Sequence, residues 1–210
     1  MTNKEILIFV EGSSDRFFLE VYLLYLYFQE KFPIKNFKVQ NVDGKGNLSK
    51  RLLEIEKYDK TLIIFDADKD YEGNKKEILK IVSKTKQIIS EEQIFLFPNN
   101  QDDGDLEDLL LKIAKHEEFI NCFESYLDCI KKKEHYKPIK NIRKNMLYAY
   151  LEAFGLEDLY TKKNIFDTEG KVKDQYKEDY KKLKEVIDFN SSSLVPLKKF
   201  LERFVENNQK

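Results

Sequence analysis

The sequence predicts an α/β fold in which a parallel sheet is flanked by helices and the C-terminal half is helical. Two observations predict it. In the first half, short apolar runs alternate with segments whose apolar residues recur every three or four positions, which is typical of strands joined by crossover helices. After Pro98 these runs stop, and helical periodicity continues almost to the end. We expect one compact unit, with an α/β core over 1–115 and a helical extension packed on it over 116–210.

The predicted elements follow in order along the chain. Ile6–Val10 and Leu62–Phe65 are unbroken β-branched and aromatic runs, typical of strands buried on both faces of a sheet. We expect strands at 5–10, 37–42, 61–66 and 93–97. Helices are expected at 14–31, 46–57, 73–90, 105–114, 116–133, 139–153, 175–187 and 194–206. The segment 161–174 is rich in Lys, Asp and Gly, which predicts a loop.

Composition narrows the class of protein. The chain carries 37 basic and 38 acidic side chains, and this balance argues against a non-specific nucleic-acid coat while allowing a local basic patch. No apolar stretch approaches the eighteen residues of a membrane span, and the N-terminal residues do not resemble a signal peptide. Cys122 and Cys129 lie too far apart along one helix for a disulfide and lack partners for a zinc site. We therefore expect a reduced, cytoplasmic protein.

Acidic residues follow two of the predicted strands. The first run leads into Glu11-Gly12-Ser13-Ser14-Asp15, and the second leads into Asp66-Ala67-Asp68-Lys69-Asp70. In an open α/β sheet, active sites form beyond the carboxyl ends of the strands. Carboxylates from two such ends can converge on Mg²⁺, which prefers oxygen ligands and keeps room for water and phosphate.

The spacing Glu11-Gly12-x-x-Asp15 followed by Asp66-x-Asp68 resembles the TOPRIM domain of topoisomerases, primases and several nucleases. A third segment, Gly104-Asp105-Leu106-Glu107-Asp108, resembles the acidic motif of the overcoming-lysogenization-defect nucleases. The residues around it, with Asp188-Phe189-Asn190-Ser191, resemble a family of small bacterial TOPRIM-like proteins. The resemblance implies a TOPRIM-like core in which Glu11 acts as an acid or base, or binds metal. It also implies metal ligation by Asp66 and Asp68, and a second cation near Glu107 and Asp108.

Structural roles compete with these assignments. Glu11 and Asp15 could each stabilise the start of the following helix through its dipole. Asp68 could belong to a solvated loop. Asp70 continues the alternation of Asp66 and Asp68, and its candidate site role is to reach the cation through water. Asp105 could cap the next helix, with Asp108 completing a box-like arrangement.

A basic segment supplies a candidate partner for phosphate. Between Lys131 and Lys144 the chain is rich in lysine, and Lys140, Arg143 and Lys144 share one helical face. The related nucleases use a lysine after the acidic motif, which makes Lys140 and Lys144 candidate catalytic residues. A solvated cationic helix face is an equally good interpretation.

These observations predict Mg²⁺- or Mn²⁺-dependent phosphodiester hydrolysis of DNA or RNA. The main alternative is a TOPRIM-like module that binds nucleotide, nucleic acid or a partner protein without cleaving it. A phospho-receiver domain is less favoured, because Pro98-Asn99-Asn100 stands where receivers carry a hydroxyl residue. Nucleic acid is the expected partner, and the oligomeric state stays open.

Overall fold

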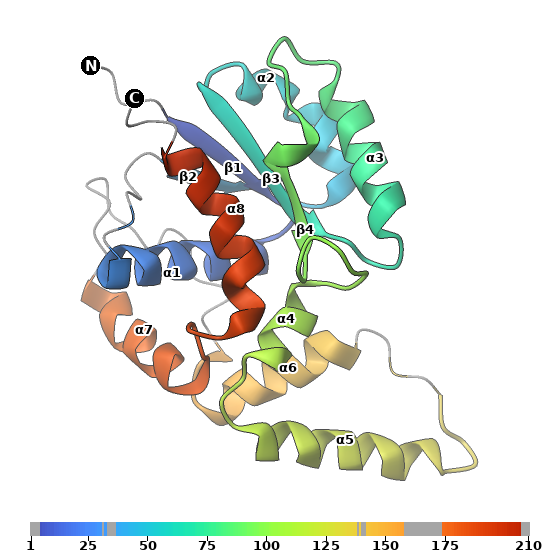
Figure 1. The fold of residues 1–210 in the computed structure, drawn as a ribbon. Coiled ribbons are helices and arrows are strands. Elements are labelled where there is room, and N and C mark those ends of the chain that lie inside the picture. Colours follow the sequence, from blue (N-terminus) through green and yellow to red (C-terminus); the bar gives the residue numbers. More distant parts are fainter. Residues whose placement is uncertain are drawn as a thin grey trace.

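A computed structural model describes residues 5–30, 32, 37–137, 139, 142–157 and 174–206. Its sheet has four parallel strands in the order β2-β1-β3-β4 (Figure 1). The strands are β1 (Ile6–Val10), β2 (Phe37–Asn41), β3 (Lys60–Asp66) and β4 (Ile94–Phe97). All pairings are parallel, with Val10 opposite Ile64 and Asp66 opposite Phe97. The α/β fold, its parallel sheet and the helical C-terminal half are thus confirmed.

Eight α-helices connect and cover the strands in the described part of the chain. They are α1 (Ser13–Glu30), α2 (Leu52–Ile55), α3 (Tyr71–Val82), α4 (Leu106–Lys112), α5 (Glu117–Lys131), α6 (Ile142–Ala153), α7 (Asp174–Val186) and α8 (Val195–Glu206). Short 3₁₀ segments occur at Lys45–Lys50, Glu91–Gln93 and Ser192–Leu194. Most bounds agree with the predicted helices within a few residues. The predicted loop at 161–174 lies, apart from Asp174, outside the described residues.

Two predicted helices were wrong in extent. The segment expected as one helix at 46–57 is a 3₁₀ turn followed by the single-turn α2. Gly44, at φ 102°, and Gly46 favour a tight loop over a continuous helix. The helix expected at 73–90 ends at Val82, and the Thr85 hydroxyl lies within hydrogen-bond distance of the carbonyls of Val82 and Gln87, either of which can accept its proton.

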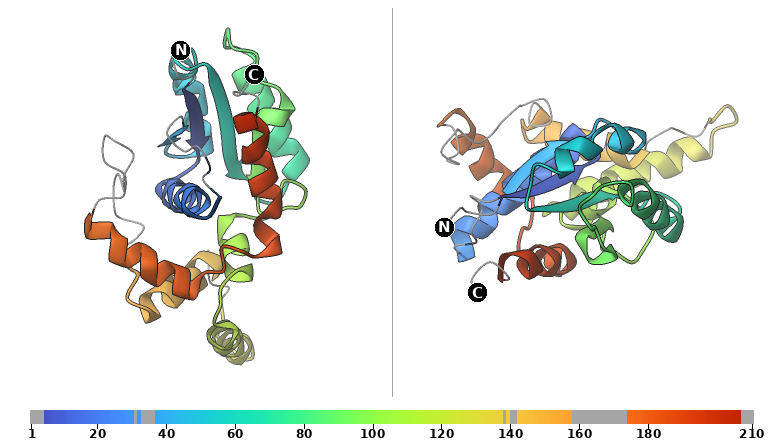
Figure 2. Two further views of the ribbon diagram at one scale, coloured as in Figure 1. Left: turned by 60° about the vertical axis from the view of Figure 1, so that its left-hand side comes forward. Right: turned by 90° about the horizontal axis from the view of Figure 1, so that it is seen from above.

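The strands separate two apolar layers. Alternate residues on one face of the sheet pack with α1, α4, α6, α7 and α8, whereas those on the other face pack with α2 and α3. The burial of whole strands explains their unbroken apolar runs. In Figure 1, α8 crosses in front of the sheet and α5 extends away from it at the bottom, and Figure 2 shows the same arrangement from two further directions.

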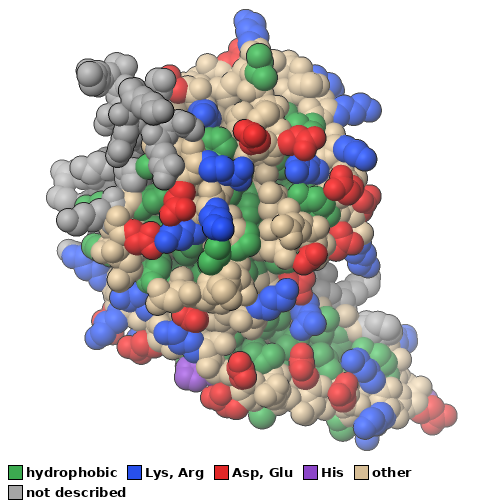
Figure 3. All heavy atoms as spheres, in the orientation of Figure 1, with side chains coloured by type: hydrophobic (Ala, Val, Ile, Leu, Met, Phe, Trp, Pro, Cys, Tyr) green, Lys and Arg blue, Asp and Glu red, His purple; other side chains and the backbone are tan. Residues whose placement is uncertain are grey.

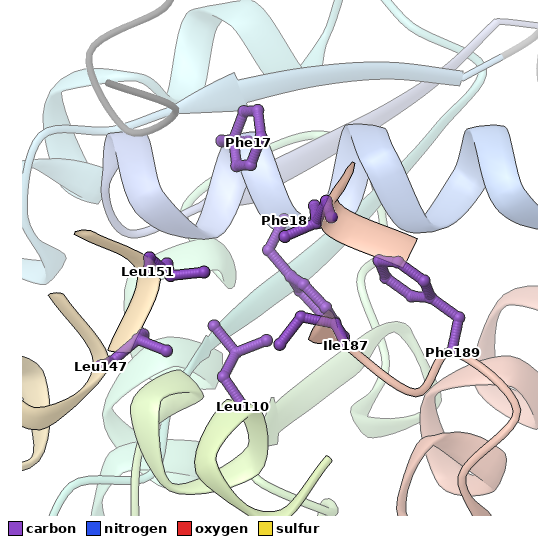
Figure 4. A pocket seen from close by; sticks show the side chains of 8 residues that line it. Phe17, Phe18, Leu110, Leu147, Leu151, Ile187 and Phe189 are labelled. Atoms are coloured by element: carbon purple, nitrogen blue, oxygen red, sulfur yellow. The ribbon is translucent and has the colours of Figure 1, made fainter. Parts of the chain in front are cut away.

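The helical half shares a core with the sheet. A small apolar pocket lies between α1, α4, α6 and the segment after α7 (Figure 4). Its lining includes Phe17, Phe18, Leu110, Leu147, Leu151 and Phe189. The chain after α4 is also tied to the end of α7, because Ala114 and Ile187 form an antiparallel bridge. The division of the chain near residue 115 stays a prediction.

The surface carries both signs of charge. On the face shown in Figure 3, basic and acidic side chains of the described residues are interspersed, as the balanced composition predicts. Cys122 and Cys129 are exposed, free thiols. None of the helices in the described ranges combines the length and the apolar character that crossing a membrane requires.

Candidate metal centre

The two sequence motifs come together at one edge of the sheet. β1 and β3 are hydrogen-bonded neighbours, so Glu11, directly after β1, and Asp66, the last residue of β3, stand at the same carboxyl edge. The charges of Asp15, Glu107 and Glu11 all act on Asp66. Four carboxyl groups from three separate segments of the chain therefore form one acidic cluster, which we define as Glu11, Asp15, Asp66 and Glu107.

Asp15 is a buried acid in the first turn of α1. Its Oδ2 accepts a hydrogen bond of 2.6 Å from the backbone N–H of Gly12, which is the helix-start role that competed with a site role. Burial raises the pKa of Asp15 to about 6, the backbone hydrogen bond opposes this shift, and the charges of Glu107 and Glu11 add to it. Asp15 therefore serves the helix and belongs to the acidic cluster at once.

Asp66 joins β3 to α4. Its Oδ1 accepts a hydrogen bond of 3.0 Å from the backbone N–H of Leu106, the first residue of α4. Burial, followed by the charges of Asp15, Glu107 and Glu11, raises the pKa of Asp66 well above its ordinary value. Like charges held this close in a buried position favour either a proton or a bound cation.

Glu11 has an unsatisfied oxygen. Its Oε1 is 3.4 Å from the backbone nitrogen of Lys45, which donates to it. Its Oε2 is buried without a hydrogen-bond partner among the described residues. A buried carboxylate oxygen without a donor is costly. A divalent cation would satisfy it, so this observation fits a metal role.

Glu107 brings α4 into the cluster and faces a lysine. Its side chain is buried, and its Oε1 lies 3.9 Å from Nζ of Lys144 in α6. Burial is the main reason that the pKa of Glu107 is raised, and the Lys144 charge opposes the shift. Burial lowers the pKa of Lys144. The hydrogen bond and charge of Tyr148 and the charges of Glu107 and Asp15 outweigh burial, so that the pKa of Lys144 is raised. Lys144 is therefore a cation at the border of the acidic cluster.

The other acids of these motifs are engaged in local structure. Asp105 caps α4 by accepting from the N–H of Asp108, and Asp108 accepts in return from the N–H of Asp105, so the predicted box-like arrangement is present. Asp108 also lies 3.5 Å from Arg143. Asp70 caps α3 by accepting from the N–H of Gly73. Metal binding by Asp70 and Asp108 stays a prediction, and Lys140 lies outside the described residues.

Asp68 lies in a strained turn that follows β3. It has a positive φ of 53°, and its backbone forms a two-way bridge with Gly104. Its Oδ2 is 2.7 Å from Nζ of Lys45. This bridge holds the loop before α4 against the end of β3, and it keeps two of the acidic motifs next to each other.

The side chains do not form a ready-made cage. Across the ranges that the structure describes, no three His, Cys, Asp or Glu side chains converge as metal ligands. The carboxylates are turned instead toward Gly12, Leu106 and Lys45. The donor set fits a hard cation in its chemistry, and a cation would have to draw these side chains away from their present partners.

Lys45 is a site residue that the two acidic motifs did not indicate. It lies in Asp43-Gly44-Lys45-Gly46-Asn47, directly after β2, and contacts both Glu11 and Asp68. A lysine between two glycines after a strand marks a tight loop at the sheet edge, but nothing in that pattern shows that the side chain reaches Asp68.

The fold and the cluster define a class: an α/β protein with carboxylates gathered at the carboxyl edge of a parallel sheet. The chain belongs to the family described as "Protein of unknown function (DUF3226)", whose model matches residues 5–206. A search of curated proteins finds no match. Among solved structures, the C-terminal region of the Burkholderia pseudomallei OLD protein is similar at a TM-score of 0.45 and 14% identity, covering 98% of each chain.

Proposed function

We propose that this protein hydrolyses phosphodiester bonds of DNA or RNA with the help of Mg²⁺ or Mn²⁺, in the manner of a TOPRIM-type nuclease. The observation that carries the proposal is the acidic cluster, in which burial and mutual repulsion raise the pKa values of Asp15 and Asp66. A cation is the ligand that relieves such repulsion. The spacing of Glu11, Asp15, Asp66 and Asp68, which resembles the TOPRIM pattern, supports the same conclusion.

Each residue has a role in this proposal. Asp66, Asp68 and Glu107 would hold the cation, with Asp70 and Asp108 as further candidates. A bound divalent cation supplies charge neutralisation at the phosphate and an acidified water. Glu11 would either share the cation or accept a proton, since its Oε2 has no hydrogen-bond donor among the described residues.

Lys144 supplies positive charge next to the acids. Its Nζ lies 3.9 Å from Glu107, and its side chain is 44% exposed, so the ammonium group can reach a phosphate in solvent. Lys140, from the same basic segment between Lys131 and Lys144, would add a second positive charge. Nucleic acid is therefore the partner that the proposal favours.

A second candidate function is a non-catalytic module that binds nucleotide, nucleic acid or a partner protein. The capping roles of Asp70 and Asp108 favour it, because these two carboxylates accept hydrogen bonds from backbone N–H groups that explain their presence. In that case the cluster would bind a cation, or a cation with a phosphate, without turnover.

A divalent-metal titration with supercoiled plasmid and with RNA distinguishes the two. The parent protein should cleave at least one substrate with Mg²⁺ or Mn²⁺ and not in EDTA, and Asp66→Asn should abolish cleavage. Glu77→Gln, an exposed acid on α3, is the matched control and should cleave like the parent. Cleavage by Asp66→Asn at the parental rate would contradict the proposal, as would metal-dependent binding of both substrates without cleavage.

A further inference from the structure

The loop after β2 is built around the acidic edge. The N–H of Gly44 donates to the carbonyl of Glu11 at 3.0 Å, and the N–H of Lys45 donates to its carboxylate at 3.4 Å. Gly44 has a φ of 102°, which favours glycine, and Asn47 closes the loop with hydrogen bonds to Asp43 and Gly44. The backbone therefore fixes Lys45 against Glu11, whatever its side chain contacts.

The Lys45 side chain crosses from one motif to the other. β1 lies between β2 and β3, so a residue that follows β2 has to span the end of β1 to reach Asp68. Nζ of Lys45 lies 2.7 Å from Oδ2 of Asp68. The exposed fraction is 15% for the lysine side chain and 58% for the aspartate side chain. The cation is thus the sheltered member of the pair and the carboxylate is the open one.

We propose that Lys45 is a phosphate-binding residue that exchanges partners when a divalent cation binds. A cation that uses Asp68 as a ligand competes with Lys45 for Oδ2. Once Asp68 is taken, the ammonium group stays at the carboxyl edge of the sheet, because the backbone of the loop anchors Lys45 beside Glu11. It then pairs with a phosphate oxygen of the substrate. This inference rests on the proposed function and adds a substrate-binding residue outside the acidic motifs.

The exposures of the two side chains explain the exchange. Asp68 is mostly in solvent, so opening its ion pair has a small free-energy cost. The ammonium of Lys45, whose side chain is only 15% exposed, gains from a new negative partner, because a partly buried charge is stabilised by an opposite one. A phosphate arriving with the cation supplies that partner. Cation and phosphodiester should therefore bind cooperatively, with Lys45 as the link.

Two binding measurements test the exchange in Lys45→Met, which keeps the backbone contacts of the loop and removes the charge. In calorimetry without nucleic acid, Mn²⁺ should bind the variant about fivefold more tightly than the parent, because its competitor is gone. With Ca²⁺ present, a fluorescent duplex oligonucleotide should bind more weakly, and the salt dependence of binding should fall by about 0.9 per lost phosphate contact.

Two further variants are controls. Lys69→Met removes an exposed charge beside Asp68 that has no ion pair within the described ranges, and it should bind Mn²⁺ and the oligonucleotide nearly like the parent. Lys45→Arg keeps the charge and should restore most of the oligonucleotide affinity. The melting temperature of each variant in EDTA shows whether it is folded.

The outcomes separate this inference from the proposed function. Unchanged or weaker Mn²⁺ binding by Lys45→Met, or unchanged oligonucleotide affinity, would overturn the role of Lys45 and leave the proposed function intact. A parent protein that binds neither Mn²⁺ nor the oligonucleotide would contradict the proposed function and the role of Lys45 together.

Discussion

The carboxylate of Asp66 accepts a hydrogen bond of 3.0 Å from the backbone N–H of Leu106, forty residues further along the chain. This contact fastens the end of β3 to the start of α4 and so places Glu107 beside the acids that follow β1 and β3. The acidic cluster depends on this contact. Changing Asp66 should therefore affect both cation binding and the stability of the edge.

Asp66→Asn should remove the repulsion and keep the hydrogen bond, because the amide oxygen can still accept from Leu106. In EDTA near neutral pH, we expect the variant to be as stable as the parent or slightly more stable, since the pKa of Asp66 is raised by burial and by its acidic neighbours. Mg²⁺ or Mn²⁺ should raise the melting temperature of the parent by ligand linkage and that of the variant much less. An equal metal response in both proteins would place the stabilising ion elsewhere.

The raised pKa of Asp15 predicts how the stability of the folded protein depends on pH. Its pKa is raised from 3.8 to about 6, so the folded state holds the proton more tightly than the unfolded state does. Stability in EDTA should therefore fall as the pH rises from about 4 to about 6, and the loss should be complete above that window. Across this window the free energy of unfolding should fall by at most about 3 kcal/mol, because each unit of pKa corresponds to about 1.4 kcal/mol.

The variant that tests this is Asp15→Asn, whose amide oxygen can still accept from Gly12. Urea unfolding across this pH range should show a flatter profile than the parent and a higher stability above the window. A profile with the same slope as that of the parent would mean that other groups set the pH dependence.

Much of this fold was predictable because the chemistry is local. Runs such as Ile6–Val10 are apolar at every position since both faces of the sheet are covered, and the crossover helices repeat their apolar residues at helical spacing. The 3₁₀ turn at Lys45–Lys50 was missed because glycines on both sides of Lys45 outweigh the apolar periodicity that follows.

The candidate site was only partly predictable. The acids after two strands could be found, because the end of a buried strand is a recognisable place in a sequence. Lys45 could not, since its contact with Asp68 depends on β1 lying between β2 and β3, and strand order is not a property of either motif. The hydrogen bond from Leu106 to Asp66 is likewise a tertiary contact that no local pattern encodes.

Lys144→Ala should weaken nucleic-acid binding, because its partly exposed ammonium group borders the acidic cluster. The slope of log affinity against log salt should fall by about 0.9 for duplex DNA, as one phosphate contact is lost. Lys76→Ala, an exposed lysine on α3, is the control and should leave the slope unchanged. A fluorescence anisotropy titration at several salt concentrations measures this, and equal slopes for all three proteins would exclude Lys144 from the interface.

Tyr150 tests the packing of the helical half. Its buried hydroxyl donates to the carbonyl of Val186 at 2.6 Å and accepts from the N–H of His116 at 3.4 Å. Tyr150→Phe removes both contacts and should lower the free energy of unfolding by about 1–2 kcal/mol. Tyr126→Phe, at a tyrosine that is 54% exposed, should change it little. A urea unfolding curve for Tyr150→Phe that matches the parent would show that these hydrogen bonds do not stabilise the junction between α6 and α7.

The most direct test of the proposed function is the rate of phosphodiester cleavage by the parent, Glu11→Gln, Glu107→Gln and the double variant, measured with Mg²⁺ and with Mn²⁺. The two acids come from different motifs, and if they act on one cation and one phosphate they act as a unit. Each single variant should then lose at least about 100-fold in rate, and the double variant should lose little more. Cleavage at the parental rate by either single variant, or nucleic-acid binding that survives in all four proteins without cleavage under either metal, would contradict a catalytic acidic cluster.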